Sequence, residues 1–354
     1  MKTLLTLAFL LCSFIATAQQ AELQALLKRE NVTGLQLIYT KKSETKQYSI
    51  GLRQAGTAQD MTATTTMQAA SLGKVVLAYT ALRLHDQGRF DLDKPLLTYA
   101  PYPRVADEPR AAKITARMVL GHTTGLPNWA DYPLAESWKN SKLTLKFAPD
   151  SCWSYSGEGY VWLQRTLEHI TGKTLDQLAQ QEVFGPLKMP HSSFTWQARF
   201  DQNAAFGHDK AGKPTDIKRF PAPNGGFSLL TTAADYSRFV RALMSGQGLK
   251  PATAKLLTTA ANPATRCTTP LTPTDANIAW AWGLGLATTS HGPAQWHWGD
   301  NGDFRGFFMT FPETKETLLL LTNSANGLKL VDEVLRLFVG PGQYQAMQWL
   351  AEEN

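Results

Sequence analysis

Ser71 and Lys74, three residues apart, are the pair whose types and spacing best support covalent chemistry in this chain. They stand in the stretch MQAASLGKVVL, residues 67–77. Apolar residues recur at helical spacing from there to Gly88, so a buried helix is predicted to begin at Ser71. Side chains at positions i and i+3 of a helix share a face. The amine of Lys74 can then help to remove the proton of the Ser71 hydroxyl, which makes the serine a nucleophile.

The same S-x-x-K spacing occurs earlier, at Ser43 to Lys46, and its context differs. That copy lies between two alternating runs, residues 35–40 and 47–50, which are typical of the strands of a hairpin. We therefore interpret it as a solvated turn and assign the chemistry to Ser71.

Tyr155 is the third candidate, because it lies on a predicted loop directly ahead of a predicted helix at residues 159–170. A phenol at such a place can exchange protons with a serine. A lone tyrosine is more often a half-buried packing residue. Its candidacy therefore depends on the other motifs.

His297 lies on a predicted strand and is followed closely by Gly299. A glycine there would let a substrate backbone lie against the strand edge. The amide of Asp300, the next residue, could pair with the Ser71 amide as an oxyanion hole. A histidine on a strand is more often a satisfied core residue, so this motif too depends on the others.

The elements that must position these residues follow the order strands, then helices, then strands. Helices are predicted at 21–29, 115–120, 159–170, 174–184, 233–244 and 328–338, and strands, besides the hairpin, at 283–288, 295–298, 306–311 and 316–322. This order predicts an α+β fold with an antiparallel sheet flanked by terminal helices and an inserted, mainly helical lobe. Residues 197–223 and 258–277 are predicted surface loops that could border the site.

Residues 1–18 have the features of a secretory signal: Lys2, an apolar run and the small-residue pattern Ala16-Thr17-Ala18. We predict that residues 19–350 form one catalytic module. Its α/β lobe is expected at about 19–70 and 280–350, and its helical lobe at about 71–279. No later apolar run is long enough to span a bilayer, so we expect a periplasmic or secreted protein.

The formal net charge of +6 becomes +5 when Lys2 is removed with the signal. These charges are dispersed, so the sequence gives little support to nucleic-acid binding. Weak attraction to anionic cell-envelope polymers is compatible with them. Neither H-E-x-x-H nor C-x-x-C spacing occurs. We therefore expect no metal and no other cofactor.

Two cysteines remain after the signal, Cys152 and Cys267. In an exported protein they can form one disulfide. Two separately buried thiols are the alternative, and the sequence does not decide between them.

Taken together, the motifs resemble those of the serine beta-lactamase and penicillin-binding-protein superfamily, specifically its class C-like branch of D-Ala-D-Ala carboxypeptidases and esterases. The resemblance covers nearly the whole mature chain and implies a beta-lactamase/transpeptidase-like fold. Ser71-Leu72-Gly73-Lys74 matches S-x-x-K, Tyr155-Ser156-Gly157 stands at the Y-x-N position, and His297-Trp298-Gly299 stands where the family has K-T-G or H-x-G. Residues 120–127, 184–190 and 224–228 also resemble family motifs.

The resemblance implies acyl transfer from a small-molecule or peptide-like acyl substrate to a serine. Ser71 would attack a carbonyl, Lys74 and Tyr155 would share the base and acid roles, and the amides of Ser71 and Asp300 would hold the oxyanion. His297 would orient the substrate or tune Tyr155. Water would then release the acyl group.

One departure affects the substrate. Gly157 occupies the position of the family's Asn, whose amide contacts a substrate amide, so an ester becomes comparatively more plausible. Glu158 could reach into the same space, but its default interpretation is a solvated carboxylate at a helix N-terminus. His122, in the stretch H-T-T-G-L-P, is predicted to hold a turn.

Three hypotheses follow. The first is a serine hydrolase of esterase or peptidase character. The second is a D-Ala-D-Ala carboxypeptidase or beta-lactamase, which needs recognition of a peptide-like amide. The third, suggested by Gly157, is a non-catalytic binding protein that keeps the fold.

Overall fold

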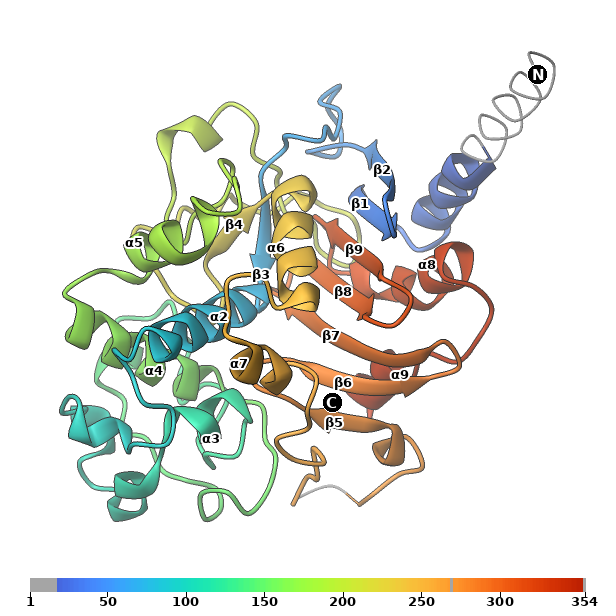
Figure 1. Ribbon diagram of the computed structural model, residues 1–354. Coiled ribbons are helices and arrows are strands. Elements are labelled where there is room, and N and C mark those ends of the chain that lie inside the picture. Colours follow the sequence, from blue (N-terminus) through green and yellow to red (C-terminus); the bar gives the residue numbers. More distant parts are fainter. Residues whose placement is uncertain (1–17, 268–269, 353–354) are drawn as a thin grey trace.

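A seven-stranded antiparallel sheet forms the frame of the molecule in the computed structural model, which describes residues 18–267 and 270–352 (Figure 1). Residues 1–17 of the predicted signal segment lie outside the described residues. The strand order is β2(Glu44–Gly51), β1(Gly34–Lys41), β9(Glu316–Thr322), β8(Arg305–Phe311), β7(Gly292–Asp300), β6(Gly285–Thr289) and β5(Ile278–Trp280). The pairing of β1 with β9 joins the first and last parts of the chain.

Both faces of this sheet are covered, and alternate residues of β9 face opposite ways. Leu318 and Leu320 pack in one apolar cluster with the helix over residues 18–29, with α8(Val331–Phe338) and with α9(Gln345–Ala351). Leu319 and Leu321 pack on the other face with α2(Leu72–Asp86) and α6(Ala233–Ser245). Each apolar residue of β9 therefore contributes to one of two cores.

The remaining helices gather around α2, which is itself buried at all but three of its fifteen residues. They are α3(Ala116–Leu120), α4(Gly157–Thr171), α5(Leu175–Ala179) and α7(Pro251–Leu256), with a π-helical segment over Gln180–Phe184. The side chains of Thr115, Thr174 and Thr232 cap α3, α5 and α6. A second sheet pairs β3(Met67–Ala70) with β4(Leu229–Thr231) and lies directly beside the start of α2.

The predicted fold class is confirmed, and most predicted elements are present within a few residues. Strands β3, β4 and β5 and helices α7 and α9 were not predicted, because elements of three to seven residues show too little periodicity. Helix α4 begins at Gly157, two residues before the predicted start. Among the described residues, every helix is too short or too polar to span a membrane.

Candidate active site

Strand β3 delivers Ser71 to the N-terminus of α2 through a strained backbone. Ala70 has a φ of +50°, in the left-handed region that a residue with a Cβ adopts at a cost of about 1–2 kcal/mol, and the register of β3 shifts between Gln68 and Ala70. Ser71 itself is the N-cap residue of α2 and is partly exposed. The hydroxyl thus lies where a buried helix meets solvent.

Lys74 lies against Ser71, as the sequence predicts. Its Nζ donates to Ser71 Oγ at 3.0 Å and to the Gly226 carbonyl at 2.9 Å. Ser71 Oγ lies 3.2 Å from the same carbonyl, to which it can donate. The Lys74 side chain is buried, and this burial lowers its pKa from 10.5 to about 7, because the interior disfavours the ammonium form. A lysine with this pKa can accept a proton near neutral pH.

The Gly226 carbonyl is held in place by its own turn, residues 224–228. The Gly226 amide donates to Asn224 Oδ1 and the Gly225 amide donates to Gln164 Oε1 of α4, both at 2.8 Å. The turn leads into β4, which pairs with β3. This pairing brings Gly226 to Ser71 across more than 150 positions of sequence.

Tyr155 lies beside this pair. Its ring centroid is 4.8 Å from Lys74 Nζ and 4.7 Å from that of Trp298. It lines a cavity of about 320 Å³ together with Ser71, Asn128, Lys146, Ser154 and Asp300. The structure therefore brings together Ser71, Lys74 and Tyr155.

Asp300, at the end of β7, lines the same cavity as Ser71. The side-chain amide of Asn301 donates to Gln68 Oε1 at 2.7 Å and to the Phe227 carbonyl at 3.1 Å. These bonds tie the end of β7 to β3 and to the turn that carries Gly226. The backbone segments that carry Ser71 and Asp300 are thereby fixed relative to each other.

The structure gives a packing reason for the glycine at position 299, and its predicted role beside a substrate backbone stays a prediction. A Cβ at this position would lie 2.4 Å from the Ala69 carbonyl oxygen of β3. The glycine is required because β3 and β7 approach each other closely.

His297 lies in the core beside Tyr155 and is not among the residues that line either cavity at Ser71. Its side chain is fully buried, its ring centroid lies 6.2 Å from that of Tyr155, and its Nδ1 lies 2.7 Å from the Trp298 carbonyl. Burial lowers the pKa of His297 to about 3, so the imidazole is neutral and its Nδ1 is the donor in that bond. Such a side chain can act on Tyr155 but does not reach a substrate in either cavity.

His122 is buried in the structure, where its Nδ1 accepts the Ser156 amide at 3.1 Å and its ring packs 4.4 Å from that of Tyr155. Burial holds the pKa of His122 well below its usual value. It therefore supports the Tyr155 loop as a neutral side chain.

Trp129 fills the space beside Gly157. A Cβ on Gly157 would lie 2.5 Å from the Trp129 ring, and one on Gly226 would lie 2.7 Å from it. The Gly157 amide donates to Asn128 Oδ1 at 3.0 Å. An indole ring, held by two glycines, therefore lies where the family's Asn side chain was expected.

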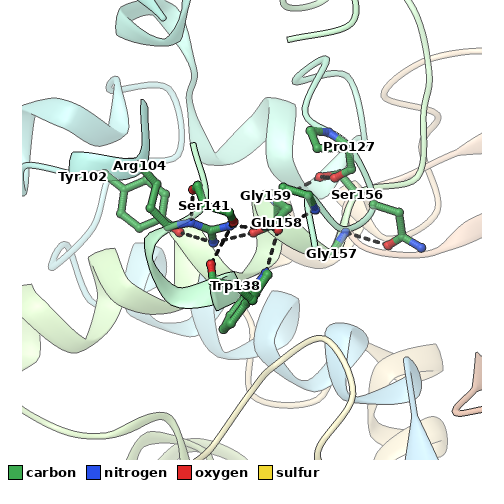
Figure 2. Close-up of polar contacts among 11 residues, drawn as sticks. Tyr102, Arg104, Pro127, Trp138, Ser141, Ser156, Gly157, Glu158 and Gly159 are labelled. Atoms are coloured by element: carbon green, nitrogen blue, oxygen red, sulfur yellow. Dashed lines mark hydrogen bonds and ion pairs between the residues drawn. The ribbon is translucent and has the colours of Figure 1, made fainter. Parts of the chain in front are cut away.

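Glu158 contradicts its default interpretation as a solvated carboxylate. It is fully buried and accepts two bonds from the Arg104 guanidinium, at 2.6 and 3.0 Å. Its Oε1 also accepts from Trp138 Nε1 at 2.7 Å and from the Ala130 amide at 2.9 Å. Figure 2 shows this carboxylate between Arg104 and Trp138, so it anchors the segment 128–141 and does not enter the site.

A second cavity, of about 240 Å³, also opens at Ser71. Its walls include Trp129, Tyr132, Leu134 and Phe227. Sequence reasoning missed Trp129, the Gly226 carbonyl and this apolar wall. A usable signal for Trp129 was its place two residues after the motif that ends at Pro127.

Within the described residues, no group of three or more His, Cys, Asp or Glu side chains could hold a metal ion. The chemistry that this arrangement can perform is nucleophilic attack by Ser71 with proton transfer through Lys74 and Tyr155. Ser71 and Lys74 stand at the start of α2, and Tyr155 lies just ahead of α4.

The sequence model of the Beta-lactamase family matches residues 20–337, so the chain belongs to the beta-lactamase family of serine hydrolases. It is 25% identical to penicillin-binding protein 4 of Amycolatopsis lactamdurans, over 91% of this chain and 88% of that protein. It is 26% identical to the esterase EstB of Burkholderia gladioli, over 65% of this chain and 70% of that protein. A class C beta-lactamase structure has the same fold, with a TM-score of 0.75 at 18% identity, covering 91% of this chain and 96% of the other.

Proposed function

We propose that this protein is a serine hydrolase that forms an acyl-enzyme on Ser71 and hydrolyses an ester. The observation that carries the proposal is the contact between Lys74 Nζ and Ser71 Oγ at 3.0 Å, made by a buried lysine with a lowered pKa. A base of this kind next to a hydroxyl at a helix start is the arrangement that nucleophilic catalysis needs.

In the proposed reaction, neutral Lys74 takes the proton of Ser71 as Oγ attacks the substrate carbonyl. The amides of Ser71 and Asp300 stabilise the oxyanion. Tyr155 then passes its proton to the leaving oxygen as the ester bond breaks, and the Lys74 ammonium beside it returns the serine proton to the phenolate. Water attacks the acyl-enzyme by the reverse sequence of proton transfers and releases the acid.

The surroundings of Gly157 favour an ester over an amide. Trp129 covers the position from which a side-chain amide would contact a substrate amide. A peptide-like substrate would lose that hydrogen bond, whereas an ester has no N–H to satisfy. Similarity to an esterase agrees with this choice.

The test is labelling with a fluorophosphonate probe and turnover of p-nitrophenyl acetate. We expect both for the wild type, and neither above background for Ser71→Ala. Ser43→Ala is the matched control, because Ser43 belongs to the exposed copy of the same spacing. Absence of labelling and turnover in the wild type would contradict the proposal.

One observation favours a second candidate, a D-Ala-D-Ala carboxypeptidase or beta-lactamase. Asn128 lines the cavity at Ser71 and its side-chain amide lies beside Gly157. It could supply the contact that Gly157 cannot. A penicillin adduct on Ser71, seen by mass spectrometry, would support this candidate, and its absence beside ester turnover would reject it.

We also propose that the protein is exported. The disulfide between Cys152 and Cys267 supports this, since such bonds persist in oxidising compartments. Sequencing the N-terminus of the mature protein tests the predicted cleavage after Ala18.

A further inference from the structure

Exposed hydrophobic side chains gather at one side of Ser71. Among the described residues, the large hydrophobic side chains that are exposed are Tyr132, Leu134 and Leu271. Tyr132 and Leu134 line the 240 Å³ cavity at Ser71, and Leu271 does not. Apolar side chains that remain exposed around a concave site mark it as a place where apolar ligand surface is buried.

The inner wall of this cavity is aromatic. Trp129 and Phe227 meet edge to face with ring centroids 5.8 Å apart, and Phe220 packs 5.4 Å from Phe227. All three belong to the lining. The cavity volume equals that of about eight water molecules, which suits an aromatic ring or a chain of six to eight carbons.

The charged groups of this cavity are already paired. Lys218 Nζ lies 3.0 Å from Asp303, and Asp300 forms an ion pair with Arg305 at 2.5 Å. Lys218 and Asp300 therefore do not need an oppositely charged group on the ligand, and the cavity is suited to an uncharged group.

The other cavity at Ser71 is the polar one. It is lined by Ser154, Asn128 and Lys146, and also by Tyr155, the proposed proton donor to the leaving oxygen. A leaving group must lie next to its proton donor. The alcohol part of an ester therefore belongs in the polar cavity, and the acyl part belongs in the aromatic one.

We infer that the substrate is an ester of an uncharged, apolar acyl group, an aromatic ring or a chain of about six to eight carbons, bound between Trp129, Phe227 and Leu134. The inference rests on the proposed function and adds the substrate class and the direction in which the ester lies across Ser71. Leu134 and Tyr132 form the exposed outer part of this cavity.

The experiment compares kcat/KM for p-nitrophenyl acetate, hexanoate and phenylacetate, which share one leaving group. The wild type is expected to prefer hexanoate and phenylacetate to acetate by about tenfold or more, because added apolar carbon enters an apolar pocket. Leu134→Asp is expected to lower the hexanoate-to-acetate ratio by about tenfold. Leu271→Asp changes another exposed leucine, outside the cavity; it is the matched control and should leave the ratio unchanged.

The results distinguish failure of the acyl-group inference from failure of the proposed esterase activity. Equal kcat/KM for the three esters, or equal effects of the two leucine variants, would overturn the acyl-group inference while the proposed esterase stands. No turnover of any ester, together with no fluorophosphonate labelling, would overturn both. Because both leucines are exposed, neither substitution is expected to unfold the protein.

Discussion

The protonation of Lys74 controls the proposed nucleophile. Three aromatic rings, those of Trp129, Tyr155 and Tyr160, lie 4.8 to 5.9 Å from its Nζ and would favour the ammonium form. The loss of water outweighs them, since burial lowers the pKa of Lys74 to about 7. The amine is thus poised near the pH at which a general base works best.

We expect kcat/KM to rise from pH 6 to pH 8 with an inflection near 7. Below its pKa Lys74 is protonated and cannot accept the Ser71 proton, and above its pKa it is neutral. The neutral fraction goes from about one tenth at pH 6 to about nine tenths at pH 8. The measurement is a pH profile for p-nitrophenyl acetate, corrected for spontaneous hydrolysis.

The imidazoles at the site should not contribute to that inflection. Burial lowers the pKa of His297 to about 3 and holds that of His122 well below its usual value. The profile of His297→Gln should therefore keep its inflection near 7, whatever its rate. A profile that is flat across this range, or one that rises only near pH 10, would contradict the assignment of Lys74 as the base.

Gly157 is the residue at which the packing of Trp129 can be tested. Gly157→Ala should lower the free energy of unfolding by about 1–3 kcal/mol, because the new Cβ would overlap the Trp129 ring. Urea denaturation measures the change. Adding Trp129→Ala should reduce the cost of the alanine, which gives a coupling energy in a double-mutant cycle.

Gly159→Ala is the matched control in the same helix. The nearest atom to a Cβ there is Ser156 Oγ at 3.4 Å, an ordinary contact. Alanine should be neutral or stabilising at this position, since it has the higher helix propensity. If both alanines proved equally harmful, the packing of Trp129 would not explain Gly157.

Residue types and spacing singled out Ser71 and Lys74, and the other motifs added Tyr155. The structure places these three side chains together, and their catalytic roles stay predictions. Ser71 and Lys74 are a local pattern on one helix, which a sequence displays directly. Gly226 was missed as the partner of Lys74, because its place depends on the pairing of β3 with β4. The burial of Glu158 was also missed, because it depends on a contact distant in sequence: Arg104 lies 54 positions before it.

At the scale of elements, one carboxylate of α4 makes several of the contacts that hold the segment 128–141 in place. Glu158 receives bonds from Arg104, from Trp138 and from the Ala130 amide. All of these partners belong to segments without regular helix or strand structure, apart from short 3-10 turns. The position of Trp129 and Leu134, and hence the apolar cavity wall, depends on this network.

Glu158→Gln should therefore lower the free energy of unfolding by about 3–5 kcal/mol, because it leaves the Arg104 guanidinium buried with a neutral partner. Thermal and urea unfolding measure the effect. Where the variant stays folded, it should also lose the preference for hexanoate over acetate.

Glu136→Gln is the control for this prediction. Glu136 lies in the same segment and pairs with Lys139, but both side chains are exposed. An exposed pair of this kind contributes about 1 kcal/mol or less. A similar loss in both variants would show that the burial of Glu158 does not matter.

At the scale of the whole molecule, the Cys152–Cys267 disulfide settles the alternative that the sequence left open. Its Cα atoms lie 5.6 Å apart and it closes a loop of 115 residues. Next to the disulfide, the Trp153 amide donates to the Thr265 carbonyl at 2.7 Å. The loop that carries Tyr155 is thus fastened to the segment that leads into β5.

Reduction of this bond should lower the free energy of unfolding by about 2–5 kcal/mol, since a long loop regains its freedom in the unfolded chain. Melting curves with and without a reductant measure the change. The double variant Cys152→Ser, Cys267→Ser should melt at the same temperature as the wild type in the presence of reductant. Adding reductant should not change the melting temperature of this variant. A wild type whose melting is indifferent to reduction would contradict the prediction.

The sheet and its covering helices could be predicted from the order of elements, because alternation and helical spacing are strong in long segments such as β9 and α2. The shape of the two cavities at Ser71 could not be predicted from the sequence. It depends on segments 128–141 and 218–227, whose conformations are set by contacts distant in sequence.

These two segments are attached separately: one through Glu158, the other through the turn that ends at Ser228. Substitutions in the segment 128–141 can reshape the proposed acyl pocket without displacing the amine of Lys74 and the hydroxyl of Ser71, which are bonded to the Gly226 carbonyl of the other segment. Relatives with an unchanged proton-transfer pair can therefore diverge in the acids they release, and overall identity is a poor guide to a shared substrate.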